Sequence, residues 1–190
     1  PVTAGVNAVD HLVVGGCDAV ELAGEFGSPL LVYDEETLRA MCRQFVNGFT
    51  ERYPDSRVAY ASKAFLNPAI AKIVAEEGLG LDVVSGGELA VAMAAGVPMD
   101  RLYFHGNNKS PQELEFAVES GIGRIVVDNF YELRLLTDIA RGRGVVQDVM
   151  VRLSPNVDPH THVHTTTGIL DSKFGFAIET GDAARAIGEA

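Results

Sequence analysis

The feature that most constrains the fold of this chain is a repeat of short apolar runs at intervals of roughly 20 to 25 residues. The runs begin near Val58, Leu81, Leu102, Ile125 and Val149. After each run, apolar residues recur with the spacing of one helix face. Strands that alternate with helices form parallel sheets, so the repeat predicts an α/β protein built from successive β/α units.

Helix-start signals follow three of the runs. Ser85-Gly86-Gly87-Glu88 and Ser110-Pro111-Gln112-Glu113 both have the pattern of a capping box, with a hydroxyl at the N-cap and a carboxylate three residues later. Asn67-Pro68 marks a third helix start, because proline suits the first helical position. These three helices are expected to end at glycines with positive φ, which are Gly78, Gly96 and Gly121.

The pattern places the elements as follows. Buried parallel strands are predicted at residues 58–61, 81–84, 102–104 and 125–127, with a fifth near 149–154 and the start of a sixth element after Phe174. Ahead of them we expect a helix near 18–26, a strand at Leu30–Tyr33 and a long helix near 35–53.

A closed (β/α)8 barrel has eight strands. We therefore expect a partial (β/α)8 TIM-type barrel of about five β/α units, formed by residues 57–190, with residues 1–56 as a helix-strand-helix lead-in. No G-x-G-x-x-G sequence follows the first strand, which disfavours a dinucleotide-binding sheet.

Composition excludes several classes of protein. The net charge of −11 argues against binding to nucleic acid or to an anionic membrane surface, because both need clustered Lys and Arg. No apolar run reaches the ~18 residues of a membrane span, and residues 1–10 show no signal peptide. Cys17 and Cys42 make no disulfide framework. We expect a cytoplasmic protein.

Polar residues stand where the predicted strands end. In an α/β barrel, reactive groups lie at the carboxyl ends of the strands. Lys63, Asp82, His105 and Arg152 occupy such positions, and so do their polar neighbours Ser85, Asn107, Asn108, Asp128, Asn129 and Ser154. For any one of them, a strand that simply becomes polar where it leaves the core is an equally good explanation.

Lys63 has the strongest chemical signal of the set. It lies between small residues, in Tyr60-Ala61-Ser62-Lys63-Ala64, which leaves space around its amine. Enclosure in a barrel mouth disfavours the charged form of a lysine and so makes its amine a nucleophile for carbonyl groups. The alternative is an ordinary surface lysine.

The segment at 60–64 resembles the Y-A-x-K-A motif of the fold-type III pyridoxal-phosphate-dependent decarboxylases, which have an alanine racemase-like barrel. Four further stretches are similar to that family in the same order: Gly27–Leu30, Leu81–Glu88, Phe104–Ser110, and Val151–Leu153 with Lys173–Gly175. The resemblance runs from about Asp10 onward. Within the family, the pattern is most similar to the members that convert meso-2,6-diaminopimelate to L-lysine.

The resemblance implies roles for individual residues. Lys63 would form a Schiff base with pyridoxal 5'-phosphate, and the cofactor would stabilise the carbanion left by loss of CO2. Asp82, His105 and Arg152 would bind the cofactor. Lys173 would pair across a homodimer interface, although a solvated loop charge explains it equally well. The substrate would be an amino acid, bound as a small molecule.

Parts of the family pattern do not occur in this sequence. The H-x-G-S and E-P-G-R stretches that hold the cofactor phosphate are missing, and so is the Cys-Glu pair that reaches the active site from the partner subunit. The C-terminal half of the barrel and the β-domain are missing as well. We therefore expect the chain to be the first part of a longer enzyme and to be inactive by itself.

Three alternatives stay open. The chain could belong to a decarboxylase for ornithine, arginine or carboxynorspermidine, or to a non-catalytic barrel that carries the same cofactor. The third alternative rests on His160, His162 and His164, whose spacing would place them on one face of a strand, as in an H-x-H metal-dependent hydrolase. Because this run lies in a loop rich in threonine, we expect no metal site.

Overall fold

The computed structural model describes residues 1–157 and 174–190. The chain divides into two compact units. The first contains residues 1–58 and 72–79, and the second contains residues 59–71 and 80–190. Each unit is described by itself.

A small antiparallel sheet begins the first unit. Its strands β1 (Gly5–Val6), β2 (Leu12–Val14) and β3 (Cys17–Asp18) pair in that order. Helix α1 (Ala19–Phe26) follows at once, because Asp18 Oδ1 accepts hydrogen bonds from the Val20 and Glu21 amides at the helix start. The other carboxylate oxygen of Asp18 lies 2.7 Å from Asn7 Nδ2 and 2.8 Å from His11 Nδ1, which ties the sheet to the helix.

The prediction of a strand at Leu30–Tyr33 is wrong. These residues have no strand structure, and Leu31 is 84% exposed. The apolar composition that suggested a strand is real, but a strand needs a hydrogen-bonded neighbour, and no described residue pairs with this segment. The strands at residues 5–18 were not predicted, since they are too short to show an alternating pattern.

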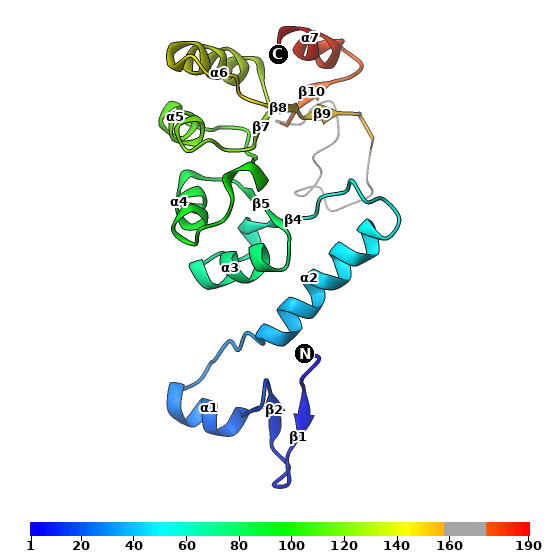
Figure 1. The fold of residues 1–190 in the computed structure, drawn as a ribbon, viewed down its shortest axis with the longest axis vertical. Helices are drawn as coiled ribbons and strands as arrows, with labels where there is room; N and C mark the ends of the chain where they lie inside the picture. The colour runs from blue at the N-terminus through cyan, green and yellow to red at the C-terminus, as the bar shows by residue number, and fades with distance from the viewer. Residues whose placement is uncertain (158–173) are drawn as a thin grey trace. The chain divides into compact units, whose positions relative to one another are not determined.

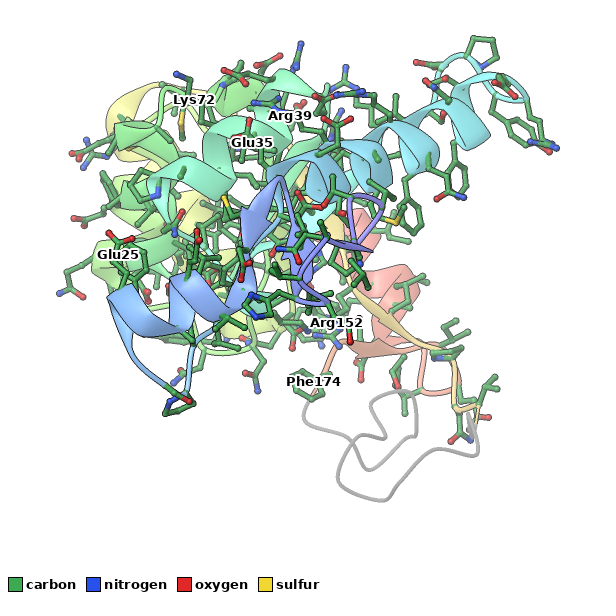
Figure 2. The ribbon with its side chains drawn as sticks, turned by 90° about the horizontal axis from the view of Figure 1, so that it is seen from below. Glu25, Glu35, Arg39, Lys72, Arg152 and Phe174 are labelled. Carbon is green, nitrogen blue, oxygen red and sulfur yellow. The ribbon has the colours of Figure 1, made fainter. Side chains whose placement is uncertain are left out.

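The predicted long helix is confirmed as α2 (Glu35–Thr50). The apolar side chains of this helix are only partly covered, because Met41, Phe45 and Phe49 are exposed. Ion pairs fix its other side: Arg39 lies 2.9 Å from Glu77 and 2.8 Å from Glu35, which Figure 2 labels beside it. Hydrogen bonds from Arg43 and Arg39 lower the pKa of Glu77 to about 2.

The second unit is built on a parallel sheet, as the repeat predicted. Five strands pair in the order β4-β5-β6-β7-β8, and helices α4, α5 and α6 lie on one face of the sheet (Figure 1). The strands are β4 (Ala59–Ala61), β5 (Gly80–Val83), β6 (Leu102–Phe104), β7 (Arg124–Val127) and β8 (Val149–Val151). The helices between them are α3 (Pro68–Glu76), which spans both units, α4 (Gly86–Ala94), α5 (Pro111–Glu119) and α6 (Phe130–Arg143), with short 3-10 turns η1 (Ser62–Ala64) and η2 (Met99–Arg101).

The core of this unit is formed by alternate residues of the central strands. These side chains are fully buried, whereas Asp82 and Tyr103, on the opposite face, are partly exposed. Burial of each such aliphatic or aromatic side chain stabilises the fold by about 1.5–3 kcal/mol. The buried strand residues are Leu81, Val83, Leu102, Phe104, Ile125 and Val127, and Leu89, Leu114 and Leu136 of the helices are buried as well.

Side-chain caps start helices α4 and α5 just after the carboxyl ends of the strands that precede them. Ser110 and Glu113 form the complete capping box that was predicted. The box at Ser85 is only half formed, because Glu88 accepts a hydrogen bond from the Val84 amide instead of the Ser85 amide. In both helices the carboxylate satisfies a backbone donor that would otherwise have no partner near the helix start.

The predicted sixth element is present. Strand β10 (Phe176–Ala177) pairs in parallel with β9 (Leu153–Ser154), and helix α7 (Asp182–Glu189) follows. Phe130 of α6 packs edge-on against Phe176 at 4.8 Å and carries the Arg185 guanidinium over its ring. These contacts attach the last helix to the sheet.

The predicted fold class is confirmed: the second unit is an open part of a barrel-like α/β fold whose main sheet has five parallel strands. Within the residues that the structure describes, no helix has both the length and the apolar character needed to cross a membrane.

Substitution of Gly123 tests the close approach of the turn before β7. An added Cβ would lie 2.7 Å from the carbonyl carbon of Asp100, which is backbone and cannot move aside cheaply. Gly123→Ala should therefore destabilise the protein by about 2 kcal/mol. Gly142→Ala is the matched control, because its Cβ meets nothing within 4 Å and alanine favours the helix by roughly 0.5 kcal/mol. Urea unfolding of both variants measures the difference, and equal stabilities would contradict the interpretation.

Candidate active site

The four expected site residues lie at one edge of the main sheet. Asp82 is within β5, paired in register with Ala61 at the end of β4, and Lys63 follows Ala61 in η1. His105 directly follows β6, where its amide donates to Val83 O at 2.8 Å. Arg152 directly follows β8, where its amide donates to Val127 O at 3.0 Å. Because the strands are parallel, these positions all belong to the carboxyl edge.

Asp82 and His105 form the centre of this group. Their closest atoms, Asp82 Oδ1 and His105 Nδ1, are 3.3 Å apart, and both side chains are partly exposed. Burial raises the pKa of Asp82, and the charges of His105, Lys63 and Arg152 oppose that rise. Burial likewise lowers the pKa of His105, and the Asp82 carboxylate opposes that fall. The electrostatics thus link all four residues.

One atom of this group has an unused bonding capacity. Asp82 Oδ1 is buried, and it accepts no hydrogen bond from any described residue, although His105 Nδ1 lies 3.3 Å from it. Ser62 Oγ, next to Lys63, is buried without a partner in the same part of the chain. Buried polar atoms almost always have partners, so an acceptor of this kind at a sheet edge suggests that a ligand supplies the donor.

Arg152 is held by residues from two other segments. Its Nη1 lies 3.3 Å from Asp128 Oδ1, and its guanidinium lies over the ring of Phe174 at 4.4 Å. Figure 2 labels Arg152 and Phe174. The other oxygen of Asp128 accepts from the Gly175 amide at 3.1 Å. Gly175 has φ +74°, and an added Cβ would lie 2.8 Å from Arg152 O, so only glycine fits beside Arg152.

Lys63 is less enclosed than the sequence suggested. We expected its amine to be enclosed in a barrel mouth, but the residue is exposed. The physical reason is that five strands do not close a barrel, so the space beyond β4 stays open to solvent in the described chain. Lys63 nevertheless lies on the carboxyl edge with Asp82, and not on the outer helical layer.

Sequence reasoning missed a buried ion pair behind the site. Lys109 Nζ lies 2.6 Å from Glu132 Oε1, and the two side chains are 1% and 3% exposed. Lys109 was noted as part of the 104–110 stretch, but no role was assigned to it. No local pattern in the sequence indicates this pair, because Glu132 lies 23 residues further along the chain.

The described residues fit the cofactor that the sequence led us to expect. Lys63 would provide a primary amine for an aldehyde, and Asp82 Oδ1 would provide a hydrogen-bond acceptor close to that amine. Arg152 provides a cation for anionic groups. No residue of the described chain is identified as the holder of the cofactor phosphate, consistent with the missing family stretches.

Two predictions concern residues 158–173, which lie outside the described part of the chain. These are the run of His160, His162 and His164 and the interface residue Lys173. Among residues 1–157 and 174–190, no group of three His, Cys, Asp or Glu side chains is arranged to hold a metal ion.

Comparison with known proteins identifies related sequences. Residues 37–190 match the family described as pyridoxal-dependent decarboxylase, pyridoxal binding domain. The chain is 50% identical to diaminopimelate decarboxylase of Halalkalibacterium halodurans over 99% of its length and 51% identical to that of Bacillus subtilis over 95%. It spans 43% and 41% of those two proteins, which is less than half of each.

A solved structure is similar along nearly the whole chain. The diaminopimelate decarboxylase of M. jannaschii superposes with a TM-score of 0.86 at 36% identity, covering 98% of this chain and 44% of that protein. A second structure of the same enzyme, in complex with L-lysine, has a TM-score of 0.85 at the same identity and coverage.

The link between Asp82 and His105 can be measured directly. In Asp82→Asn the carboxylate that raises the pKa of His105 is gone while burial still lowers it, so the imidazole should titrate at a lower pH than in the unchanged protein. NMR titration of the His105 ring measures this. The exposed Asp138→Asn on α6 serves as a control, and a His105 pKa that is equal in both variants would contradict the assignment.

Proposed function

Because the chain belongs to the pyridoxal-dependent decarboxylases, as their pyridoxal-binding domain, we propose that the whole protein decarboxylates meso-2,6-diaminopimelate to L-lysine with pyridoxal 5'-phosphate as cofactor. The observation that carries this proposal is that Lys63, Asp82, His105 and Arg152 lie together at one edge of the sheet. The chain that holds them is 50% and 51% identical in sequence to two proteins named diaminopimelate decarboxylase.

The substrate rests on the relatives. The curated relatives reported above carry the name of this activity, and the similar M. jannaschii structure was solved with L-lysine, which is the product of the proposed reaction. Similarity along nearly the whole chain favours this substrate over ornithine, arginine or carboxynorspermidine. It also favours an enzyme over a non-catalytic barrel that carries the same cofactor.

When bound, pyridoxal phosphate supplies an electron sink that stabilises the negative charge left on the substrate carbon after CO2 departs. The residues of this chain would bind and orient it. Lys63 presents the amine to the cofactor aldehyde, and its exposure leaves that amine accessible. Asp82 would lie close to the cofactor, where its carboxylate sets the polarity around the Lys63 amine.

His105 and Arg152 would contact the cofactor from the neighbouring strands. Burial favours the neutral imidazole of His105, which is an uncharged aromatic ring suited to packing against a pyridine ring. Asp128 and the ring of Phe174 hold the Arg152 guanidinium in place, so it can bind an anionic group without reorganisation.

The proposal extends to the setting of the site. We place the whole protein in the cytoplasm as a homodimer, with residues 1–56 as a lead-in and residues 57–190 as the cofactor-binding part of the barrel. The support is the kind of protein that the relatives are, together with the family pattern in which a partner subunit completes the active site.

Chemical labelling and turnover test the function together. The full-length protein should release CO2 from meso-2,6-diaminopimelate, and borohydride reduction in the presence of pyridoxal phosphate should leave a pyridoxyl group on Lys63 that mass spectrometry locates. Lys63→Ala should lose both the label and turnover, because no other amine takes that place at the β4 end.

Lys72→Ala is the matched control, since this lysine is 69% exposed on α3 and pairs only weakly with Glu76 at 3.9 Å. It should keep both the label and the activity. Label on a different lysine would refute the site, and faster CO2 release from ornithine or arginine would refute the substrate.

A further inference from the structure

The buried Lys109 has a surrounding that the proposed chemistry does not use. Its Nζ donates to three oxygens: Glu132 Oε1 at 2.6 Å, Val126 O at 2.7 Å and Gly106 O at 2.8 Å. It also lies 5.6 Å from the centre of the Phe104 ring. No other lysine of the described chain is as deeply buried.

The geometry matches a charged Lys109. Burial lowers the pKa of Lys109 and raises that of Glu132, so burial alone would favour neutral forms. With Glu132 ionised, however, the three oxygen acceptors around the nitrogen match the three N–H groups of the ammonium form. A neutral amine beside the ionised carboxylate would point its lone pair at an oxygen. The structure therefore holds a desolvated ion pair, and such pairs are a poor way to gain stability.

The pair connects the two loops that carry site residues. On one side, Lys109 Nζ donates to the carbonyl oxygen of Gly106, and Gly106 directly follows His105. On the other side, the second oxygen of Glu132 accepts from the Asp128 amide at 3.0 Å, and Asp128 holds the Arg152 guanidinium. One ammonium and one carboxylate thus join the loop after β6 to the loop after β7.

A hydrogen bond also joins the same two loops. Asn129 Nδ2 donates to Asn107 O at 3.3 Å, and Asn129 Oδ1 accepts from the Glu132 amide at 2.9 Å. This bond is longer and lies nearer to the surface than the bonds of Lys109. The ion pair is therefore the stronger of the two connections between the loops.

We propose that Lys109 and Glu132 are positioning residues that fix the separation between the His105 imidazole and the Arg152 guanidinium in the cofactor site. The inference rests on the proposed function, because it assigns both side chains to cofactor binding. Neither Lys109 nor Glu132 touches the cofactor; they act through the backbone at Gly106 and at Asp128.

The test removes both charges together in the full-length protein. Lys109→Met alone leaves Glu132 buried without its partner and should lower the Tm, so it cannot separate folding from positioning. The double variant Lys109→Met with Glu132→Gln buries no charge and keeps an acceptor for the Asp128 amide. Its Tm should recover most of that loss.

Despite that recovery, the double variant should still bind pyridoxal phosphate about tenfold more weakly, which corresponds to about 1.4 kcal/mol. Its kcat should fall by about the same factor or more, and its KM for the amino acid should change little. Titration of the cofactor absorbance well below the Tm of each variant measures the affinity. In the cofactor-free protein, the NMR resonances of the His105 ring should shift.

The matched control is Glu119→Gln with Arg143→Met. This ion pair has the same 2.6 Å separation and joins the same helices, α5 and α6, but at their far ends and in solvent. It should change neither cofactor affinity nor the His105 resonances.

The proposal is overturned if the double variant regains its Tm and also binds the cofactor and turns over like the unchanged protein, because the pair is then purely structural. Failure of the proposed function looks different. If the unchanged protein binds pyridoxal phosphate without releasing CO2 from diaminopimelate, the change in cofactor affinity and the His105 resonances still decide the role of the pair.

Discussion

Parallel pairing of β4 through β8 is the constraint on which the candidate site depends. A parallel ladder forces each crossover to return along the helical layer, so every strand ends at the same edge and every loop after a strand opens there. Lys63 and Arg152, far apart in sequence, are brought to one edge in this way. The burial of alternate strand residues against α4, α5 and α6 keeps that edge in register, because a slip of one residue would exchange the two faces of a strand.

Polar contacts between neighbouring loops then hold the loops at that edge in fixed positions. The carboxylate of Glu113 accepts from the Gly86 amide at 2.8 Å, which joins the starts of α4 and α5. Lys109 and Glu132 join the next pair of loops, and Asp128 reaches Arg152 beyond them. Side chains held in this way need little reorganisation when a ligand arrives, which is a general requirement for binding sites that act electrostatically. The network therefore connects the helix caps to the chemistry of the site.

Local signals explain which elements were predictable. The five strands, the Ser110 cap and the helix-ending Gly96, with φ +73°, follow from residues close together in sequence. The segment at Leu30–Tyr33 misled the prediction, because apolar composition says nothing about whether a pairing strand is near. Lys109 was missed for a related reason: its partner Glu132 is 23 residues away, and only packing shows that both are buried.

The sequence by itself determined the α/β repeat, the positions of the helix caps and the identity of the four candidate side chains, because each depends on local spacing or on a short motif. The tertiary structure decided which of these side chains share an environment, since pKa values and hydrogen bonds depend on neighbours that the chain brings from other strands. It left Lys63 open to solvent, gave Asp82 an unpaired oxygen and placed a charged pair behind His105. Burial and long-range contact are properties of the packed sheet, and no local pattern encodes them.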